Sequence, residues 1–281
     1  KHRHIWPQLD RSFRVGRIAV NGAFQNALND PRHAKETKPQ IIPEMINPVK
    51  TPTRAISRDK LLIAGQAKRG AVQPAHPAPA TARSAASRAL EAGQLGYTDA
   101  LGIKSLRQAI ARWATRRFEL TPGSLTPEHH IVPVNGTREG IFSLVQSVAE
   151  SSQSATVVSP NPFYQVYEGA AFLAGATPHY LACDADSHFI PDFDKVPKSV
   201  WIDCQVLFLC SPGNPSGSVI PRETLVRVIE LADEHDFIIA SDECYSELYP
   251  DERQPPEGLL QTCAAIGRND FARCIVFHSL S

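Results

Sequence analysis

The feature that most constrains this fold is an alternation of apolar, strand-like segments with helix-like segments between residues 90 and 281. The strand-like segments are short, as in "CQVLFLC" and "FIIASD", and amphipathic patterns such as "RETLVRVIELADEHD" separate them. Strands that alternate with helices indicate βαβ units and a mostly parallel sheet. The sequence therefore predicts an α/β fold of three layers, αβα.

Polar turns follow several of these strand-like segments. Right-handed crossovers place the C-terminal ends of parallel strands along one edge of the sheet, where open α/β sheets bind ligands. Three turns are rich in Gly, Ser, Asn or Asp, namely "NGTREG" (135–140), "SPGNPSG" (211–217) and "SDECYSELY" (241–249). We therefore expect these turns to form one site.

The turn "NGTREG" has the composition of an anion site. We expect a strand that ends at Val134 and a helix that begins near Thr137. Gly136 allows close backbone approach, Thr137 offers a hydroxyl, and the first N–H groups of the helix can bind a phosphate. The alternative is that Gly136 and Thr137 only cap the helix.

The other two turns present an amide, a carboxylate and a phenol. Prolines and glycines stiffen "SPGNPSG" around Asn214, whose amide can donate to a ligand oxygen, although an ordinary turn has the same composition. Asp242 follows an apolar strand, so its carboxylate needs a cationic or hydrogen-bonding partner, and Tyr245 can point toward the same region. The alternative is that Ser241 or Asp242 caps a helix.

In combination these motifs resemble the pyridoxal-phosphate-dependent aminotransferases of fold type I, class I/II. The resemblance rests on "SPGNPSG", on Asp242 lying 28 residues after Asn214 in "SDECYSELY", and on a strand that closes in "SLS". With "NPFYQVYEGAAFLAGATP", the chain is most similar to bacterial succinyldiaminopimelate aminotransferases. The resemblance covers roughly residues 89–281. It implies a large αβα domain, pyridoxal 5'-phosphate as cofactor, and transfer of an amino group from glutamate to N-succinyl-2-amino-6-ketopimelate in lysine biosynthesis.

The resemblance also implies a role for each residue that contacts the cofactor ring. Asp242 would pair with the protonated pyridine nitrogen and keep the ring cationic, so that the ring acts as an electron sink. Asn214 and Tyr245 would hydrogen-bond the 3-hydroxyl oxygen. Tyr164 would stack on the ring face, with Phe163 as the second choice.

A second group of residues would hold the cofactor phosphate. By the same resemblance these are Gly136, Thr137 and Arg138, with a hydroxyl from Ser279. Tyr97 in "GYTDALG" matches a tyrosine that reaches the phosphate of the neighbouring subunit, which implies a homodimer with shared sites.

The family's motif after the last strand runs "SLSK", and its lysine forms the Schiff base. The given sequence ends at Ser281, so we expect that lysine immediately after it, followed by a small C-terminal domain. On this interpretation no catalytic residue lies in the chain, and the chain alone is inactive. The alternatives are another class I/II aminotransferase, acting on aspartate, alanine or aromatic substrates, or a non-catalytic truncated remnant.

Residues 1–81 differ in character from residues 82–281, which we predict to be the partial large domain. Residues 1–88 hold 16 of the 29 Lys and Arg but only 5 of the 29 Asp and Glu, and prolines recur, as in "QPAHPAPATA". We expect a poorly ordered segment, or one foreign to the family. A basic arm that binds nucleic acid is the alternative, but no aromatic interleaving accompanies the charge.

The cysteines and the hydropathy indicate a compartment. The six cysteines form no CxxC pair and no metal-ligand spacing, which suits free thiols in a reducing cytosol. No apolar run reaches the roughly 18 residues of a membrane span, and "KHRHIWPQLDRSFRV" is not followed by the apolar region of a signal peptide. We therefore expect a cytoplasmic enzyme without a metal, nucleic-acid or membrane partner.

Overall fold

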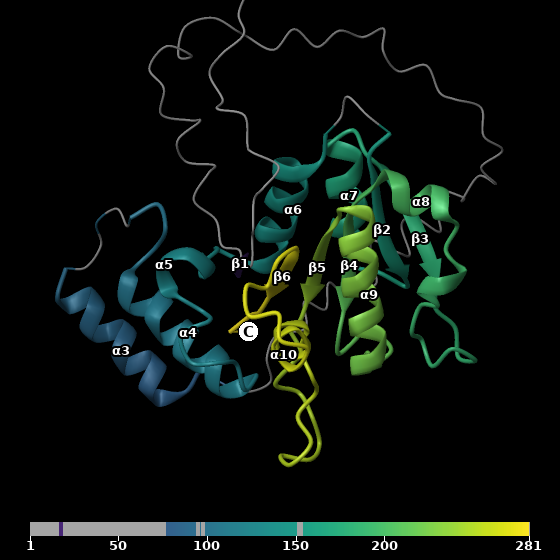
Figure 1. Cartoon of the computed structure of the whole chain (residues 1–281). Coiled ribbons are helices and arrows are strands. Elements are labelled where there is room, and N and C mark those ends of the chain that lie inside the picture. Colours follow the sequence, from purple (N-terminus) through teal and green to yellow (C-terminus); the bar gives the residue numbers. More distant parts are fainter. Residues whose placement is uncertain (1–16, 19–76, 94–95, 97–98, 151–153, 281) are drawn as a thin grey trace, which may run out of the picture. The chain divides into compact units, whose positions relative to one another are not determined.

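The computed structural model of the chain describes residues 17–18, 77–93, 96, 99–150 and 154–280 (Figure 1). These residues fall into two compact units, with 77–93 and 96 in one and the remainder in the other. Most of the basic segment and the predicted site residue Tyr97 lie outside the described residues, so the expectations for them stay predictions.

The smaller unit contains one helix in its described part, α3 (Ala80–Glu91). The helix ends just before Gly93, whose φ of +67° lies in the left-handed region that a glycine adopts without steric cost.

The larger unit contains a six-stranded sheet in the order β1-β6-β5-β4-β2-β3. Every strand pair in the described ranges is parallel, as the βαβ alternation predicted. Two residues of the basic segment join this sheet, because Arg17 and Ile18 pair with Ile275 and Val276. The strands are β1 (Arg17–Ile18), β2 (Thr156–Asn161), β3 (Thr177–Ala182), β4 (Cys204–Cys210), β5 (Ile238–Asp242) and β6 (Cys274–Phe277).

Helices alternate with these strands along the chain (Figure 1). Helix α9 illustrates the sequence rule: its buried residues recur at helical spacing, and Arg222, Glu223, Glu230, Asp233 and Glu234 on its other face are exposed. The buried residues are Leu225, Val228, Ile229, Leu231 and Ala232. The helices are α4 (Lys104–Arg117), α5 (Pro127–His130), α6 (Thr137–Val148), α7 (Gln165–Leu173), α8 (Lys198–Asp203), α9 (Arg222–His235) and α10 (Leu259–Ala265), with a 3-10 turn η2 (Phe193–Lys195). None of the helices within the described ranges combines the length and the hydropathy needed to cross a membrane.

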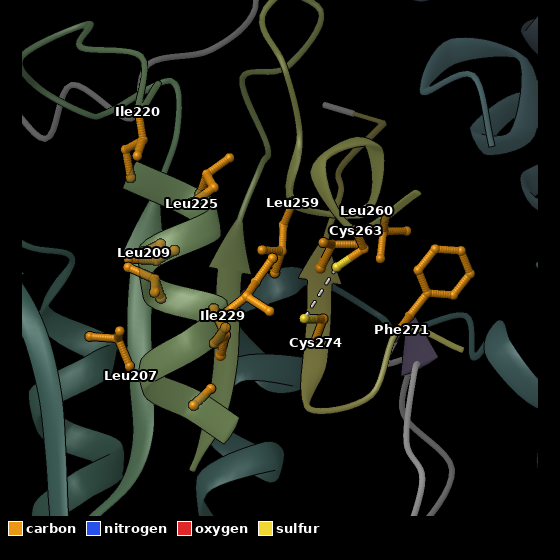
Figure 2. Packing of buried hydrophobic residues seen from close by; sticks show 14 of the residues in the cluster. Leu207, Leu209, Ile220, Leu225, Ile229, Leu259, Leu260, Cys263, Phe271 and Cys274 are labelled. Atoms are coloured by element: carbon orange, nitrogen blue, oxygen red, sulfur yellow. Dashed lines mark hydrogen bonds between the residues drawn. The ribbon is translucent and has the colours of Figure 1, made fainter. Parts of the chain in front are cut away.

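Strand β4 shows that the sheet is covered on both faces. Its side chains alternate between two hydrophobic clusters: Leu207 and Leu209 belong to the cluster of α4, α9 and α10, and Val206 and Phe208 to that of α6 and α7. Figure 2 shows the first cluster, in which side chains of α9 and α10 pack against β4 and β6. The predicted αβα layering is therefore confirmed.

One predicted strand is wrong. The segment expected to form a strand ending at Val134 follows α5 and makes only an isolated bridge at Ile131. Pro133 interrupts this segment, and a proline cannot donate to a strand ladder. The predicted helix start at Thr137 is confirmed.

Candidate functional site

A cavity of about 570 Å³ opens at the C-terminal edge of the sheet, where the polar turns meet. Six of the nine predicted cofactor residues line it: Thr137, Tyr164, Asn214, Asp242, Tyr245 and Ser279. The predicted Gly136 and Arg138 flank Thr137 at the start of α6. The cavity is also lined by Pro160, Pro162, Phe163, Gln165, Tyr167, Cys210, Pro215, Cys244 and Leu248.

Asp242 is the most buried of the predicted site residues, with 7% of its surface exposed. It ends β5, and a turn at residues 244–247 follows it where the alternative interpretation expected a capped helix. Its Oδ1 accepts the N–H of Cys244 at 3.3 Å, and its Oδ2 accepts the phenol of Tyr167 at 2.9 Å. Among the described residues, no Lys, Arg or His forms an ion pair with this carboxylate.

Tyr167 is a site residue that the sequence interpretation missed. Its ring is 1% exposed and stacks on Phe208 of β4 at a centroid distance of 4.3 Å, so its hydroxyl is held against Asp242. Burial, followed by the charge of Asp242, raises the pKa of this phenol far above its usual value. The phenol therefore stays protonated and donates to the carboxylate. The available signal was its position in "NPFYQVY", one helical turn after Tyr164.

Asn214 and Tyr245 lie side by side at the cavity wall. The Asn214 amide Nδ2 donates to the Tyr245 hydroxyl at 3.0 Å. The loop that carries Asn214 is closed by two backbone bonds, from Gly213 N–H to the Ser218 carbonyl and from Gly217 N–H to the Gly213 carbonyl, both at 2.7 Å. The two side chains can therefore address a single ligand oxygen from a fixed loop.

The start of α6 has the features of an anion site. Its N-cap residue is Gly136, and no side chain among the described residues caps this helix end, which argues against the capping-only interpretation. The Thr137 hydroxyl accepts a weak bond from the Cys244 thiol at 3.6 Å.

Arg138 and Tyr164 are linked to each other at the rim. Arg138 Nε donates to the Tyr164 hydroxyl at 2.7 Å, and the guanidinium carbon lies 5.9 Å from the ring centroid. Phe163, the second choice for ring stacking, instead stacks on Tyr180 at a centroid distance of 5.0 Å and an interplanar angle of 13°. This difference favours Tyr164 as the aromatic face available to a ligand.

Two thiols that the sequence interpretation did not single out also line the cavity. Burial raises the pKa of Cys210 to about 11 and raises the pKa of Cys244 further. Both are therefore neutral at physiological pH and contribute no charge to the site. Asp242 consequently supplies the anionic charge on this side of the cavity.

This residue set fits a flat, cationic heteroaromatic ring that carries a phosphate. A buried carboxylate without a cation is costly unless a ligand provides the positive charge. An aromatic ring face, paired oxygen-binding groups and an uncapped helix start complete the arrangement. Pyridoxal 5'-phosphate has each of the complementary groups.

Comparisons with known proteins agree with this fit. The family model "Aminotransferase class I and II" matches residues 65–281. The LL-diaminopimelate aminotransferase of Aquifex aeolicus is 33% identical over 213 residues, which cover 75% of this chain and 52% of that protein. The chain thus spans about half the length of the curated relatives it matches.

Solved structures give the same family and fold. An aminotransferase from Neisseria meningitidis is 40% identical, with a TM-score of 0.68 over 74% of this chain and 52% of that one. An aspartate aminotransferase from Thermus thermophilus is 30% identical, with a TM-score of 0.60 over 67% of this chain and 47% of that one.

Proposed function

The chain belongs to the class I and II aminotransferases, which depend on pyridoxal 5'-phosphate, and we propose that it forms the cofactor-binding part of an enzyme that transfers an amino group from glutamate to a keto acid. The single observation that carries this proposal is Asp242. It is a buried carboxylate that faces a cavity and has no cationic partner among the described residues.

Five residues that line the cavity have a role toward the cofactor ring in this proposal. Asp242 holds the proton on the pyridine nitrogen, and Tyr167 fixes the orientation of Asp242 through its 2.9 Å bond. Asn214 and Tyr245 hydrogen-bond the 3-oxygen of the ring, and Tyr164 covers its face. When bound, the cofactor would supply an electron sink.

The phosphate is assigned to the start of α6. The free N–H groups after Gly136 and the Thr137 hydroxyl bind its oxygens, with Arg138 and Ser279 adding a charge and a hydroxyl. Tyr97 contributes to the phosphate site of a second subunit, so the enzyme acts as a homodimer. We assign this enzyme to the cytoplasm.

For the substrate we propose N-succinyl-2-amino-6-ketopimelate, with glutamate as the donor. The motif resemblance supports the succinylated keto acid, and the relatives named LL-diaminopimelate aminotransferase, one of them 33% identical, support a substrate of the diaminopimelate type. The second candidate acceptor is oxaloacetate, the keto acid that corresponds to aspartate, because an aspartate aminotransferase is 30% identical at a TM-score of 0.60. Assays of the enzyme with glutamate as donor and each keto acid as acceptor separate the two candidates.

Cofactor binding is tested by titrating the 281-residue chain with pyridoxal 5'-phosphate and following the absorbance of the cofactor. We expect Asp242→Ala to weaken binding by about 10–100-fold, because a hydrogen bond to a charged group contributes roughly 1.5–3 kcal/mol. The matched control is Asp186→Ala, since Asp186 is exposed and outside this cavity. Equal affinities for the wild type and Asp242→Ala would overturn the proposal.

A further inference from the structure

A buried acid–base pair adjoins the cofactor cavity. Glu243, which directly follows Asp242, is 2% exposed, and His278 directly precedes Ser279. The Oε2 of Glu243 lies 3.7 Å from the Nε2 of His278. The two side chains thus connect the segments that carry two of the proposed cofactor residues.

Glu243 binds three parts of the fold at once. Its Oε1 accepts the Ser241 hydroxyl at 3.0 Å and the Leu259 N–H at the start of α10 at 2.8 Å. Its own N–H donates to the carbonyl of Phe277, the last residue of β6, at 2.9 Å. The end of β5, the end of β6 and the start of α10 are therefore held together at this residue.

The hydrogen bonds of His278 define its tautomer. Its Nδ1 lies 3.3 Å from the backbone carbonyl of Glu243 and 3.4 Å from the Ser246 hydroxyl. A carbonyl can only accept and a hydroxyl can do either, so the tautomer with the hydrogen on Nδ1 satisfies both contacts. The Nε2 atom is buried and has no hydrogen-bond partner within the described part of the chain. In a neutral ring Nε2 then presents a lone pair to Glu243 Oε2, and a protonated carboxyl can donate to it after a small closure.

The surroundings of the pair disfavour an ion pair. The His278 ring stacks on Phe118 at 5.3 Å and meets the edge of Trp113 at 5.0 Å. Burial raises the pKa of Glu243 to about 7 and lowers the pKa of His278 to about 4, and both directions favour the neutral forms.

Two charged groups face the pair from neighbouring elements. Arg117 of α4 lowers both pKa values, and Asp242 of β5 raises that of Glu243. Arg117 is itself paired with Glu247 at 2.7 Å and donates to the carbonyls of Ser246 and Pro256. Because its charge is compensated there, it does not replace His278 as the partner of Glu243.

We propose that Glu243 and His278 are positioning residues that share one proton as a neutral carboxylic acid–imidazole pair and thereby fix Asp242 and Ser279 for the cofactor. The proton resides on Glu243 Oε2 and is donated to His278 Nε2, while Nδ1–H is donated to the Glu243 carbonyl. The positioning role rests on the proposed function, but the protonation state is measured without the cofactor.

The variants His278→Gln and Glu243→Gln test the protonation states of the pair, because their stabilities should depend on pH in opposite directions. The unfolded chain holds Glu243 and His278 near their ordinary values of 4.5 and 6.5, so between these pH values it has an ionised carboxyl and a charged imidazole. The folded neutral pair carries the same single proton. The pair therefore adds no slope to the stability of the wild type between pH 4.5 and 6.5.

Each substitution removes one of the two groups, so the stability of the variant depends on pH through the group that remains. In His278→Gln the raised pKa of Glu243 contributes stability that is full below pH 4.5 and is lost as the pH rises through about 7. In Glu243→Gln the lowered pKa of His278 has the opposite effect, so stability is lost as the pH falls from 6.5 through about 4. Each tilt, meaning the slope of a variant's stability against pH, approaches a tenfold change in the unfolding equilibrium constant per pH unit.

Urea unfolding of the full chain at pH values from 4 to 7.5 measures these slopes. The matched controls are Glu223→Gln and His129→Gln, two exposed positions whose slopes should follow the wild type. Opposite tilts in the two pair variants support groups that are both neutral in the folded chain, and tilts equal to the wild type overturn the proposal. The nitrogen chemical shifts of His278 in the wild type at pH 5.5 locate the proton. A neutral imidazole supports the shared proton, whereas a charged imidazole indicates an ion pair and overturns the proposal.

Cofactor titration tests the positioning role. Wild-type affinity for pyridoxal 5'-phosphate should fall as the pH rises through about 7, where Glu243 ionises, and Glu243→Gln should lack this step. Cofactor binding that depends on Asp242, without the pH step, overturns the positioning role and leaves the proposed function intact. Opposite tilts without any cofactor binding overturn the proposed function and the positioning role with it.

Discussion

Asp242 and Glu243 are consecutive carboxylic acids in opposite environments. Asp242 faces the cavity beside Tyr167 and α7, whereas Glu243 points to the other side, where Ser241, the start of α10 and His278 bind it. Successive side chains at a strand end point to opposite faces of the sheet, so adjacency in sequence separates the two groups in space. The carboxyl of Asp242 is therefore available to a ligand, whereas that of Glu243 binds other parts of the fold.

The largest expected effect comes from removing the side chain of Glu243. Glu243→Ala leaves the Leu259 N–H and the Ser241 hydroxyl without their acceptor, and each buried unsatisfied group costs about 1–3 kcal/mol. We expect a loss of about 2–4 kcal/mol in the free energy of unfolding, measured by urea denaturation at pH 6. A loss no greater than that of Glu223→Ala, the exposed control, would show that Glu243 does not stabilise the fold.

The next effect concerns the group that orients Asp242. Tyr167→Phe removes the 2.9 Å bond and keeps the stack on Phe208, so we expect pyridoxal 5'-phosphate to bind about tenfold more weakly because a hydrogen bond to a charged acceptor is lost. Absorbance titration measures this change. Tyr180→Phe is the matched control, because its hydroxyl bonds Glu168 outside the cavity. An unchanged affinity in Tyr167→Phe would exclude an orienting role.

A smaller effect separates the two aromatic candidates at the rim. Tyr164→Ala should weaken cofactor binding by about 3–10-fold, since an aromatic stack contributes roughly 0.5–1.5 kcal/mol. Phe163→Ala should leave the affinity close to that of the wild type, because Phe163 stacks on Tyr180. The reverse order of affinities in the same titration would assign the ring face to Phe163.

The smallest expected effect is that of Asp242→Asn on the stability of the cofactor-free chain. Asp242→Asn should change the free energy of unfolding of the cofactor-free chain by no more than about 0.5 kcal/mol. The reason is that the carboxylate has no cationic partner in the described part of the chain, and Asn retains an acceptor for Tyr167. Urea denaturation beside Glu243→Ala provides the measurement. A loss as large as that of Glu243→Ala would show that Asp242 is also structural.

The sequence predicted much of the fold because local periodicity carries the necessary information. The apolar runs predicted β4, β5 and β6, and the spacing of apolar residues predicted α9. The same kind of prediction was wrong for residues 131–134, where an apolar segment containing Pro133 does not form a strand ladder. A hydrophobic pattern is therefore insufficient where the backbone lacks a donor.

The αβα class could be predicted from the sequence, as could the meeting of Asn214, Asp242 and Tyr245 at one edge, because strand direction and crossover handedness follow from local rules. The bond from Tyr167 to Asp242 across 75 residues and the contact of Glu243 with His278 could not be predicted in this way. These contacts depend on which strands become neighbours and which face each helix covers. Long-range packing sets both, and no local pattern encodes them.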